Sequence, residues 1–324
     1  MEKTKRYQLR VDRSGNGERI DTYISRHISS ITRSQVKKLI DEGCIVLDNV
    51  RPKPNERLKL GQVLTIEVTR RSRELRPFNM PLSILYEDDC ILAVDKPAGI
   101  AVHPSETLNE PTLVEALIEQ RPEIKKVGER KRPGLVHRLD KETSGVLLIA
   151  KDGDIQRTLM SFFASHRVKK YYVALTNGTP KENKGTIETF IIRHPVYRQR
   201  YTVSEESGRR SVTTYRVLRR FSDAFSLIMA NPLTGRTHQV RVHLKHLKCP
   251  VLCDKLYSSR ESLFLSNLQG RKANSTEKPI LSRQALHSFS ISFIHPITTK
   301  YIRIKAPLPA DIRETITVLS SVFP

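Results

Sequence analysis

The most informative stretch of the chain is GLVHRLDKETSGVLLIAK, residues 134–151. Its second half, VLLIAK, begins with five apolar residues in a row and predicts a buried strand. Its first half is a polar loop that carries His137, Arg138 and Asp140. Polar side chains on a loop that a rigid strand holds in place are typical of functional sites. Taken alone, the loop is equally consistent with a structural ion pair between Asp140 and a neighbouring cation.

The sequence on both sides of this loop predicts many strands and few helices. Several predicted strands follow one another without a helix between them, which favours an α+β fold over a regular βαβ repeat. We therefore expect a mixed, largely antiparallel sheet flanked by helices. The expected strands cover residues 91–95, 146–150, 171–176, 213–218, 225–230, 288–293 and 300–305, and the expected helices cover 112–120, 154–166 and 238–246.

A smaller unit is predicted toward the N-terminus, over residues 18–69. Thr32 can cap a helix that begins TRSQVKKLIDEG, and Gly43 follows as a stop signal. Val36, Leu39 and Ile40 fall on one face of this helix, as a core-facing stripe requires. In VLTIEV, residues 63–68, apolar and polar side chains alternate, which predicts a half-buried strand.

Basic side chains gather on the other face of the predicted N-terminal helix. Arg33, Lys37 and Lys38 form a ridge there, away from the apolar stripe. The charged stretch RRSRELRPFNM, residues 70–80, has no periodicity and contains a proline, so we expect a basic linker. A separate domain then covers residues 81–324.

The composition indicates a folded protein that meets a polyanion. The chain has 56 Lys and Arg residues against 34 Asp and Glu residues, a formal net charge of +22, and 38% hydrophobic residues. RNA, DNA or an anionic membrane surface would each match this charge. No apolar stretch approaches the roughly 20 residues of a membrane span, and no signal peptide is evident. The four cysteines show no disulfide framework, so we expect a cytoplasmic protein with reduced thiols and no membrane partner.

Four blocks of sequence, in order, resemble the RluA-type family of RNA pseudouridine synthases. The block HRLDKETSG resembles the signature of that family. The other three are LSILYEDDCILAVDKPAGIAVHP at 82–104, NPLTGRTHQVRVHL at 231–244 and LHSFSISFIHP at 286–296. The N-terminal unit resembles the S-four RNA-binding domain through ERIDTYIS, TRSQVKKLIDEGCIVLDN and KLGQVLTIEV. Together the two units most resemble the branch that modifies large-subunit ribosomal RNA.

The resemblance implies that Asp140 is the catalytic aspartate. Pseudouridine formation breaks the bond from uracil to ribose, rotates the base and rejoins it through carbon 5. No atom is gained or lost, so we expect no cofactor. The carboxylate could act as a nucleophile, as an electrostatic stabiliser or as a base toward the sugar, and the sequence leaves all three routes open.

The resemblance assigns roles to further residues. Arg138 matches the arginine that takes the place of the flipped uridine, and Tyr172 matches the tyrosine near the target base. Arg236 matches an arginine that pairs with the catalytic aspartate. His238 and Arg241 either contact RNA or buttress the helix that follows.

Two features of the C-terminal half stand apart from the family pattern. Cys253 occupies a position where the family usually has glycine, a departure expected to leave the catalytic positions untouched. His243, His246, Cys249 and Cys253 could supply zinc ligands, but their intervals differ from the usual spacings, so we expect no metal. The competing hypothesis for function is a catalytically silent RNA-binding or ribosome-assembly protein. In either case we expect a monomer.

Overall fold

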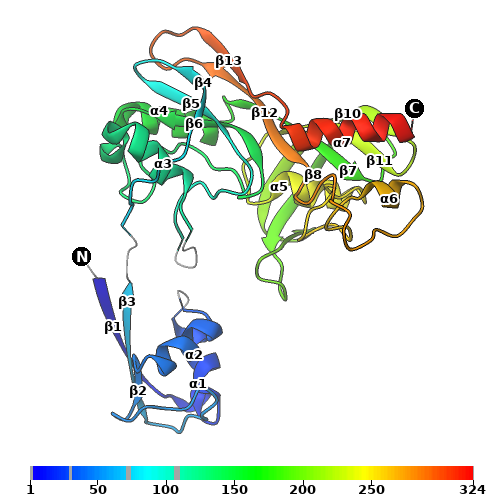
Figure 1. Ribbon diagram of the computed structural model, residues 1–324. Helices are drawn as coiled ribbons and strands as arrows, with labels where there is room; N and C mark the ends of the chain where they lie inside the picture. Colours follow the sequence, from blue (N-terminus) through cyan, green and yellow to red (C-terminus); the bar gives the residue numbers. More distant parts are fainter. Residues whose placement is uncertain (1–2, 29–30, 71–73, 106–109, 324) are drawn as a thin grey trace. The chain divides into compact units, whose positions relative to one another are not determined.

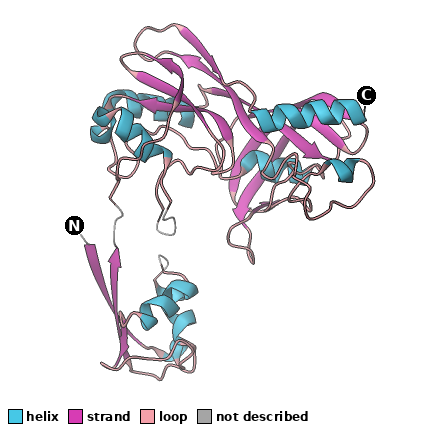
Figure 2. Ribbon diagram, in the orientation of Figure 1, coloured by secondary structure: helices cyan, strands magenta, loops and turns pink. Residues whose placement is uncertain are grey.

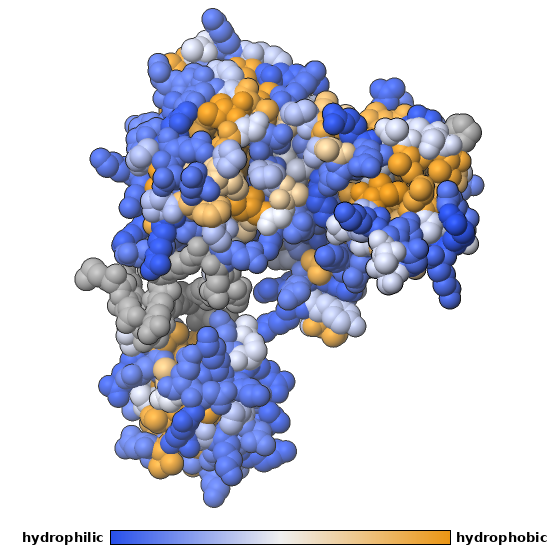
Figure 3. Space-filling view, viewed as in Figure 1, coloured by the Kyte–Doolittle hydropathy of each residue, from blue (hydrophilic) through white to orange (hydrophobic). Residues whose placement is uncertain are grey.

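The computed structural model describes residues 3–28, 31–70, 74–105 and 110–323. Its contacts divide the chain into two units, residues 1–74 and 75–324 (Figure 1). Hydrophilic side chains cover most of the visible face of each unit, with hydrophobic patches between them (Figure 3). None of the helices within the described ranges is long and apolar enough to cross a membrane.

The N-terminal unit packs two helices against a three-stranded antiparallel sheet with strand order β1-β3-β2. Its predicted helix is confirmed as α2, in which Thr32 and Gln35 form a reciprocal capping box. Val36 and Ile40 are buried in the core of the unit, and Gly43 has the positive φ of a helix stop. The elements are β1 (Lys3–Arg10), η1 (Arg13–Gly15), α1 (Ile20–His27), α2 (Arg33–Asp41), β2 (Ile45–Leu47) and β3 (Val63–Arg70).

The first strand of this unit was not predicted. β1 pairs with β3 along its whole length, from Lys3 opposite Arg70 to Arg10 opposite Val63. In KTKRYQLR only Tyr7 and Leu9 are apolar, and both pack against the core. Two apolar positions are too few to reveal a strand by periodicity. The unit therefore extends beyond the predicted range 18–69 at its N-terminal end.

The C-terminal unit is built on a ten-stranded sheet with strand order β4-β5-β6-β12-β7-β11-β10-β8-β9, in which β13 pairs with β12. Neighbouring strands are antiparallel except β6 and β12, so the predicted mixed, largely antiparallel α+β fold is confirmed. The strands are β4 (Ser83–Glu87), β5 (Ile91–Lys96), β6 (Ser144–Ala150), β7 (Lys169–Asn177), β8 (Lys184–Arg193), β9 (Tyr201–Ser204), β10 (Arg209–Phe221), β11 (Phe225–Pro232), β12 (Leu286–Ile294) and β13 (Tyr301–Lys305). The helices are α3 (Leu113–Gln120), η2 (Pro122–Lys126), α4 (Gly153–Ala164), α5 (Gln239–His246), α6 (Leu265–Leu268) and α7 (Ala310–Val322).

Helices cover both faces of the sheet around β6, which explains the unbroken apolar run that follows the polar loop (Figure 2). Val146 and Leu148 pack with α4, whereas Leu147 and Ile149 pack with α3. Every residue of β6 is buried as a result. The loop that precedes this strand is therefore anchored at one end in the core.

The predicted basic linker at 70–80 is only partly described, because residues 71–73 lie outside the described residues. Beyond them, Leu75 and Met80 pack against the core that contains α3. The backbone N–H of Arg76 donates to the carboxylate of Glu115 at 3.1 Å. Residues 75–80 thus belong to the C-terminal unit by their contacts.

Candidate active site

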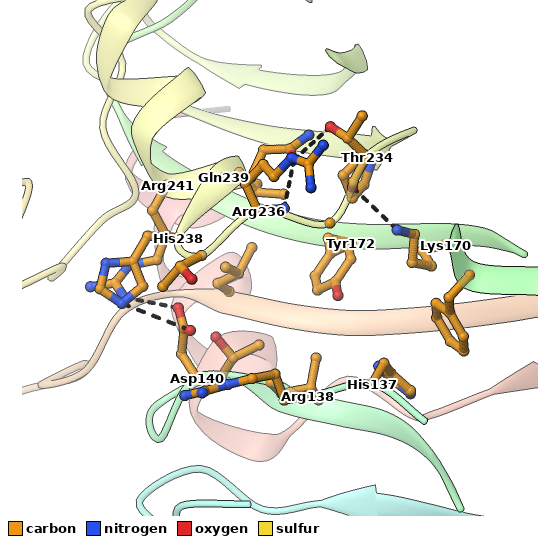
Figure 4. A pocket seen from close by; sticks show the side chains of 18 of the residues that line it. His137, Arg138, Asp140, Lys170, Tyr172, Thr234, Arg236, His238, Gln239 and Arg241 are labelled. Carbon is orange, nitrogen blue, oxygen red and sulfur yellow. Dashed lines mark hydrogen bonds and ion pairs between the residues drawn. The ribbon is translucent and has the colours of Figure 1, made fainter. Parts of the chain in front are cut away.

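A cavity of about 490 Å³ opens between the polar loop at 136–143, strand β7 and the turn before α5 (Figure 4). A second hollow has a volume of about 600 Å³. Four residues line both hollows: Arg138, Asp140, His238 and Arg241. Asp140 therefore lies where the two hollows meet.

Asp140 is oriented by a chain of charged hydrogen bonds. Arg241 donates through Nη1 to Asp140 Oδ2 at 2.8 Å, and through Nε and Nη2 to Asp254 at 2.7 and 2.8 Å. Burial alone would lower the pKa of Arg241, but the hydrogen bonds and charge of Asp254, together with Asp140, raise it. The arginine is thus a fixed, charged support between two carboxylates.

The predicted pairing of Arg236 with Asp140 is wrong, because Arg241 takes that place. Arg236 is exposed on the turn before α5, where its Nε donates to the carbonyl oxygen of Arg210 at 3.3 Å. Its backbone N–H donates to the side chain of Gln239, which also accepts from Thr234. The turn is therefore held by Gln239, while the Arg236 side chain remains at the rim of the cavity.

His238 lines both hollows beside Asp140 and is held by Tyr257. His238 has a left-handed backbone at the start of α5, and its Nδ1 lies 2.8 Å from the hydroxyl of Tyr257. Its Nε2 lies 3.8 Å from Asp140 Oδ1. Burial lowers the pKa of His238, which favours the neutral ring.

The departure from the family pattern at Cys253 lies closer to the site than expected. Cys253 has a φ of 57°, a conformation that glycine adopts without strain. The next residue, Asp254, holds the Arg241 that orients Asp140. The buried Cys253 side chain packs in the core of the unit, which compensates for the backbone strain.

Arg138 and Tyr172, both predicted site residues, line the same cavity as Asp140. The Arg138 side chain is exposed, two residues before Asp140 on the loop. Tyr172 comes from β7, and burial, together with the charge of Asp140, raises the pKa of its hydroxyl. The phenol therefore keeps its proton at neutral pH and can donate a hydrogen bond.

Lys170 is a cavity residue that the sequence did not single out. It lies two residues before Tyr172 on β7, so both side chains project from the same face. Its Nζ donates to the carbonyl oxygen of Thr234 at 3.2 Å, and burial lowers its pKa to about 8. Alternation along KKYY was the available signal, since positions 170 and 172 share one face.

A second lysine, Lys96, supports the polar loop that carries Asp140. It is completely buried at the end of β5, and its Nζ donates to the carbonyl oxygens of Pro97, Ile100 and Lys141 at 2.7, 2.8 and 3.0 Å. Burial lowers the pKa of Lys96 to about 7. Because Lys141 directly follows Asp140, this amine fixes the backbone at the site.

His137 is a structural residue rather than a proton carrier. Its Nε2 accepts from the backbone N–H of Leu148 at 2.9 Å, and its ring stacks on Phe163 at 4.7 Å. Burial, together with the nearby Lys170, lowers the pKa of His137 to about 3. The ring therefore stays neutral and ties the loop to β6.

The candidate zinc ligands do not converge on one point. Both ring nitrogens of His243 meet threonine hydroxyls, Thr213 at 2.9 Å and Thr189 at 3.1 Å. Among the described residues, possible ligand atoms gather only at Asp88, Cys90 and His295.

The cluster of Asp88, Cys90 and His295 is also unsuited to a metal. His295 Nδ1 accepts from the backbone N–H groups of Ile297 and Thr298, so Nε2 is the ring nitrogen that carries a proton. The protonated Nε2 faces Asp88 at 3.1 Å and has no lone pair to offer.

The basic ridge of the N-terminal unit is exposed on α2, as predicted. Arg33 donates through two nitrogens to Asp21, which also accepts from Arg19. Burial would raise the pKa of Asp21, but these two arginines lower it to about 2. Lys38 lies 3.6 Å from Glu42, whereas Lys37 has no ion-pair partner within the described ranges.

Comparison with protein families agrees with both units. A family model described as RNA pseudouridylate synthase matches residues 90–246, and one described as the S4 domain matches residues 18–64. The first match spans the loop with Asp140 and all of α5. The second spans α1, α2, β2 and the first two residues of β3.

Individual relatives extend over nearly the whole chain. Ribosomal large subunit pseudouridine synthase D of Xanthomonas campestris pv. campestris is 35% identical over 320 residues, 96% of this chain and 92% of its own. A protein of Aquifex aeolicus named as an uncharacterized RNA pseudouridine synthase is 35% identical over 318 residues, 96% of each chain. The structure of human RNA pseudouridylate synthase domain containing 4 has a TM-score of 0.57 and 25% identity, and covers 74% of this chain and 93% of its own.

Proposed function

The chain belongs to the RNA pseudouridine synthase family, and we propose that it isomerises uridines of large-subunit ribosomal RNA with Asp140 as the catalytic residue. The observation that carries this proposal is the Asp140 carboxylate, held by Arg241 at the meeting point of two hollows. Relatives that align over most of the chain are named for the large ribosomal subunit, which supports the choice of RNA.

The geometry suggests which oxygen of Asp140 meets the substrate. Oδ2 accepts a hydrogen bond from Arg241, whereas Oδ1 lies 3.8 Å from Nε2 of His238. Oδ1 is thus the oxygen free to approach the ribose or the base. A uridine flipped out of the RNA can enter the cavity, where Tyr172 lies beside Asp140 (Figure 4).

The reaction is balanced without any added group. The bond from N1 of uracil to C1′ of ribose breaks, and a bond from C5 to C1′ forms. The proton leaves C5, and N1 gains one. Arg138, exposed at the rim, is placed to fill the space that the flipped base leaves in the RNA.

The test is Asp140→Asn, which keeps the shape and removes the carboxylate. We expect essentially no pseudouridine from this variant, whereas its affinity for ribosomal RNA stays within about twofold of the parent. The measurements are tritium release from RNA labelled at C5 of uridine and filter binding. Turnover within about tenfold of the parent would overturn the role of Asp140.

We also propose that the protein acts as a monomer in the cytoplasm. A net charge of +22 opposes self-association in the absence of RNA. Sedimentation of the RNA-free protein at several concentrations tests the first point, and a concentration-dependent dimer would contradict it.

A further inference from the structure

An exposed hairpin lies at one edge of the large sheet, next to the cavity. Residues 193–201 connect β8 to β9, and β9 is the edge strand. The segment, RHPVYRQRY, contains three arginines and no acidic residue. Val196 and Tyr197 at its tip are 73% and 57% exposed. An exposed aromatic ring flanked by arginines combines the flat surface and the positive charge that single-stranded nucleic acid binds.

The tip of this hairpin is ordered by its own contacts. The side chain of Arg193 donates to the carbonyl oxygen of Arg198 at 2.7 Å, and His194 Nδ1 accepts from two backbone N–H groups of the turn. The Tyr197 ring lies 5.1 Å from the ring of His194 and 4.9 Å from the guanidinium of Arg200. Tyr197 is therefore held in place while more than half of its surface remains open.

The base of the hairpin packs against His238, which lines the cavity. The backbone N–H of Tyr201 donates to the hydroxyl of Tyr257 at 2.8 Å, and the Tyr201 ring meets His238 edge-on at 5.5 Å. Four residues of extended chain span at most about 14 Å, so Tyr197 lies within that reach of Tyr201. The tip is thus linked to Asp140 through Tyr201 and His238, whose Nε2 lies 3.8 Å from the Asp140 carboxylate.

We propose that the 193–201 hairpin is a second RNA-contact site, at which Tyr197 stacks on an unpaired nucleobase near the target uridine. An ordered aromatic side chain loses little conformational entropy on binding, and a nucleobase offers a flat face to it. Arg198 and Arg200 supply the positive charge that a neighbouring phosphate needs. This inference rests on the proposed function for the identity of the RNA, but not for the stacking itself.

The variants Tyr197→Ala and Tyr197→Phe separate stacking from charge. Stacking on one base contributes enough that Tyr197→Ala is expected to weaken binding of a fluorescein-labelled 12-nucleotide oligouridine by about 5- to 100-fold. Tyr197→Phe keeps the ring and should bind within about twofold of the parent. Because tyrosine is uncharged, neither variant should change the slope of log affinity against log salt.

A 12-base-pair RNA duplex and a matched tyrosine provide the controls. The duplex offers no unpaired internal base, so its affinity should be the same for the parent and Tyr197→Ala. Tyr301 on β13 is 62% exposed, and Tyr301→Ala should change neither affinity. Unchanged oligouridine binding by Tyr197→Ala, or equal losses for oligouridine and duplex, would overturn the stacking site. The stacking site would also be overturned if Tyr197→Ala changed the sedimentation of the RNA-free protein, because Tyr197 would then contact a second copy of the chain.

Pseudouridine formation by the parent is measured separately on ribosomal RNA. A parent that forms none, together with selective loss of oligouridine binding by Tyr197→Ala, would reject the proposed function and retain the hairpin site. If the parent forms pseudouridine and Tyr197→Ala binds oligouridine normally, the proposed function is kept and the hairpin site is rejected.

Discussion

The shape of the guanidinium explains why Arg241 suits its position. Two of its nitrogens bind Asp254 and a third binds Asp140, an arrangement that needs a rigid, planar fork of donors. A lysine carries the same charge at a single point and cannot hold both carboxylates in register. The orientation of Asp140 thus depends on the geometry of this residue as well as on its charge.

We therefore expect Arg241→Lys to lower turnover by about 100-fold, the cost of a reacting group displaced by about 1 Å. RNA affinity should change little, because Arg241 is buried and its donors face two carboxylates. Single-turnover kinetics at saturating ribosomal RNA give the first quantity, and filter binding gives the second.

Arg236→Lys is the matched control, since it changes the same residue type on the same segment. The exposed Arg236 side chain donates to the carbonyl oxygen of Arg210 and not to Asp140. Arg236→Lys should therefore keep the saturated rate within about threefold of the parent. A larger loss from Arg236→Lys than from Arg241→Lys would contradict our assignment of the orienting arginine.

At the level of residues, the sequence was sufficient to predict site residues that lie close together in the chain. Asp140 and Arg138 are two residues apart on one loop, so placing the loop places both. Arg236 and Arg241 occur in one block, TGRTHQVR, and the sequence does not say which of them faces Asp140. That depends on where α5 begins, at Gln239, and on Asp254, which is 13 residues farther along the chain than Arg241.

At the level of elements, the basic residues of α2 have two roles: one forms an internal ion pair and the others face the solvent. Arg33 is occupied by Asp21 and thereby links α2 to α1. Lys37 and Lys38 are exposed, and the pair between Lys38 and Glu42 is a weak surface interaction. The two lysines are therefore the residues of the ridge most available to phosphates.

We expect Lys37→Ala combined with Lys38→Ala to flatten the slope of log affinity against log salt by about 1.4 to 1.8, if each lysine neutralises one phosphate. The saturated rate should be unchanged, since phosphate contacts position the RNA without taking part in the chemistry. Filter binding of ribosomal RNA across a salt series measures the slope.

Arg33→Ala serves as the comparison for the two lysines. It leaves the partly buried Asp21 with one arginine fewer, so we expect it to lower the thermal stability more than the salt slope. An unchanged slope in the double lysine variant would mean that RNA docks on another face of the protein.

The elements that the sequence revealed are those with a strong periodic or capping signal. The apolar run of β6 and the capping box of α2 are examples. The edge strand β9, YTVS, is half-buried throughout and has no alternation to detect. Helix α7, ADIRETITVLSSV, is rich in β-branched residues, which weakens its helical signal, and its packing against the core stabilises it.

At the level of the whole molecule, the position of the boundary between the units has energetic consequences. Each unit has its own hydrophobic core, which favours independent folding. Leu75 and Met80 pack on the core of the C-terminal unit, and the carbonyl oxygen of Met80 accepts from Gln120 at 2.6 Å. A boundary at residue 81, as the sequence suggests, would remove these contacts.

We expect a fragment of residues 75–324 to melt about 4–8 °C above a fragment of residues 81–324. The two apolar side chains contribute about 2 kcal/mol by burial, and about 1 kcal/mol shifts the melting temperature of a unit this size by roughly 2–4 °C. Differential scanning calorimetry of both fragments gives the comparison. The variant Leu75→Ala in the longer fragment is the control, and it should show part of the same loss. Equal melting temperatures for the two fragments would mean that residues 75–80 are a linker after all, and that the catalytic unit begins at β4.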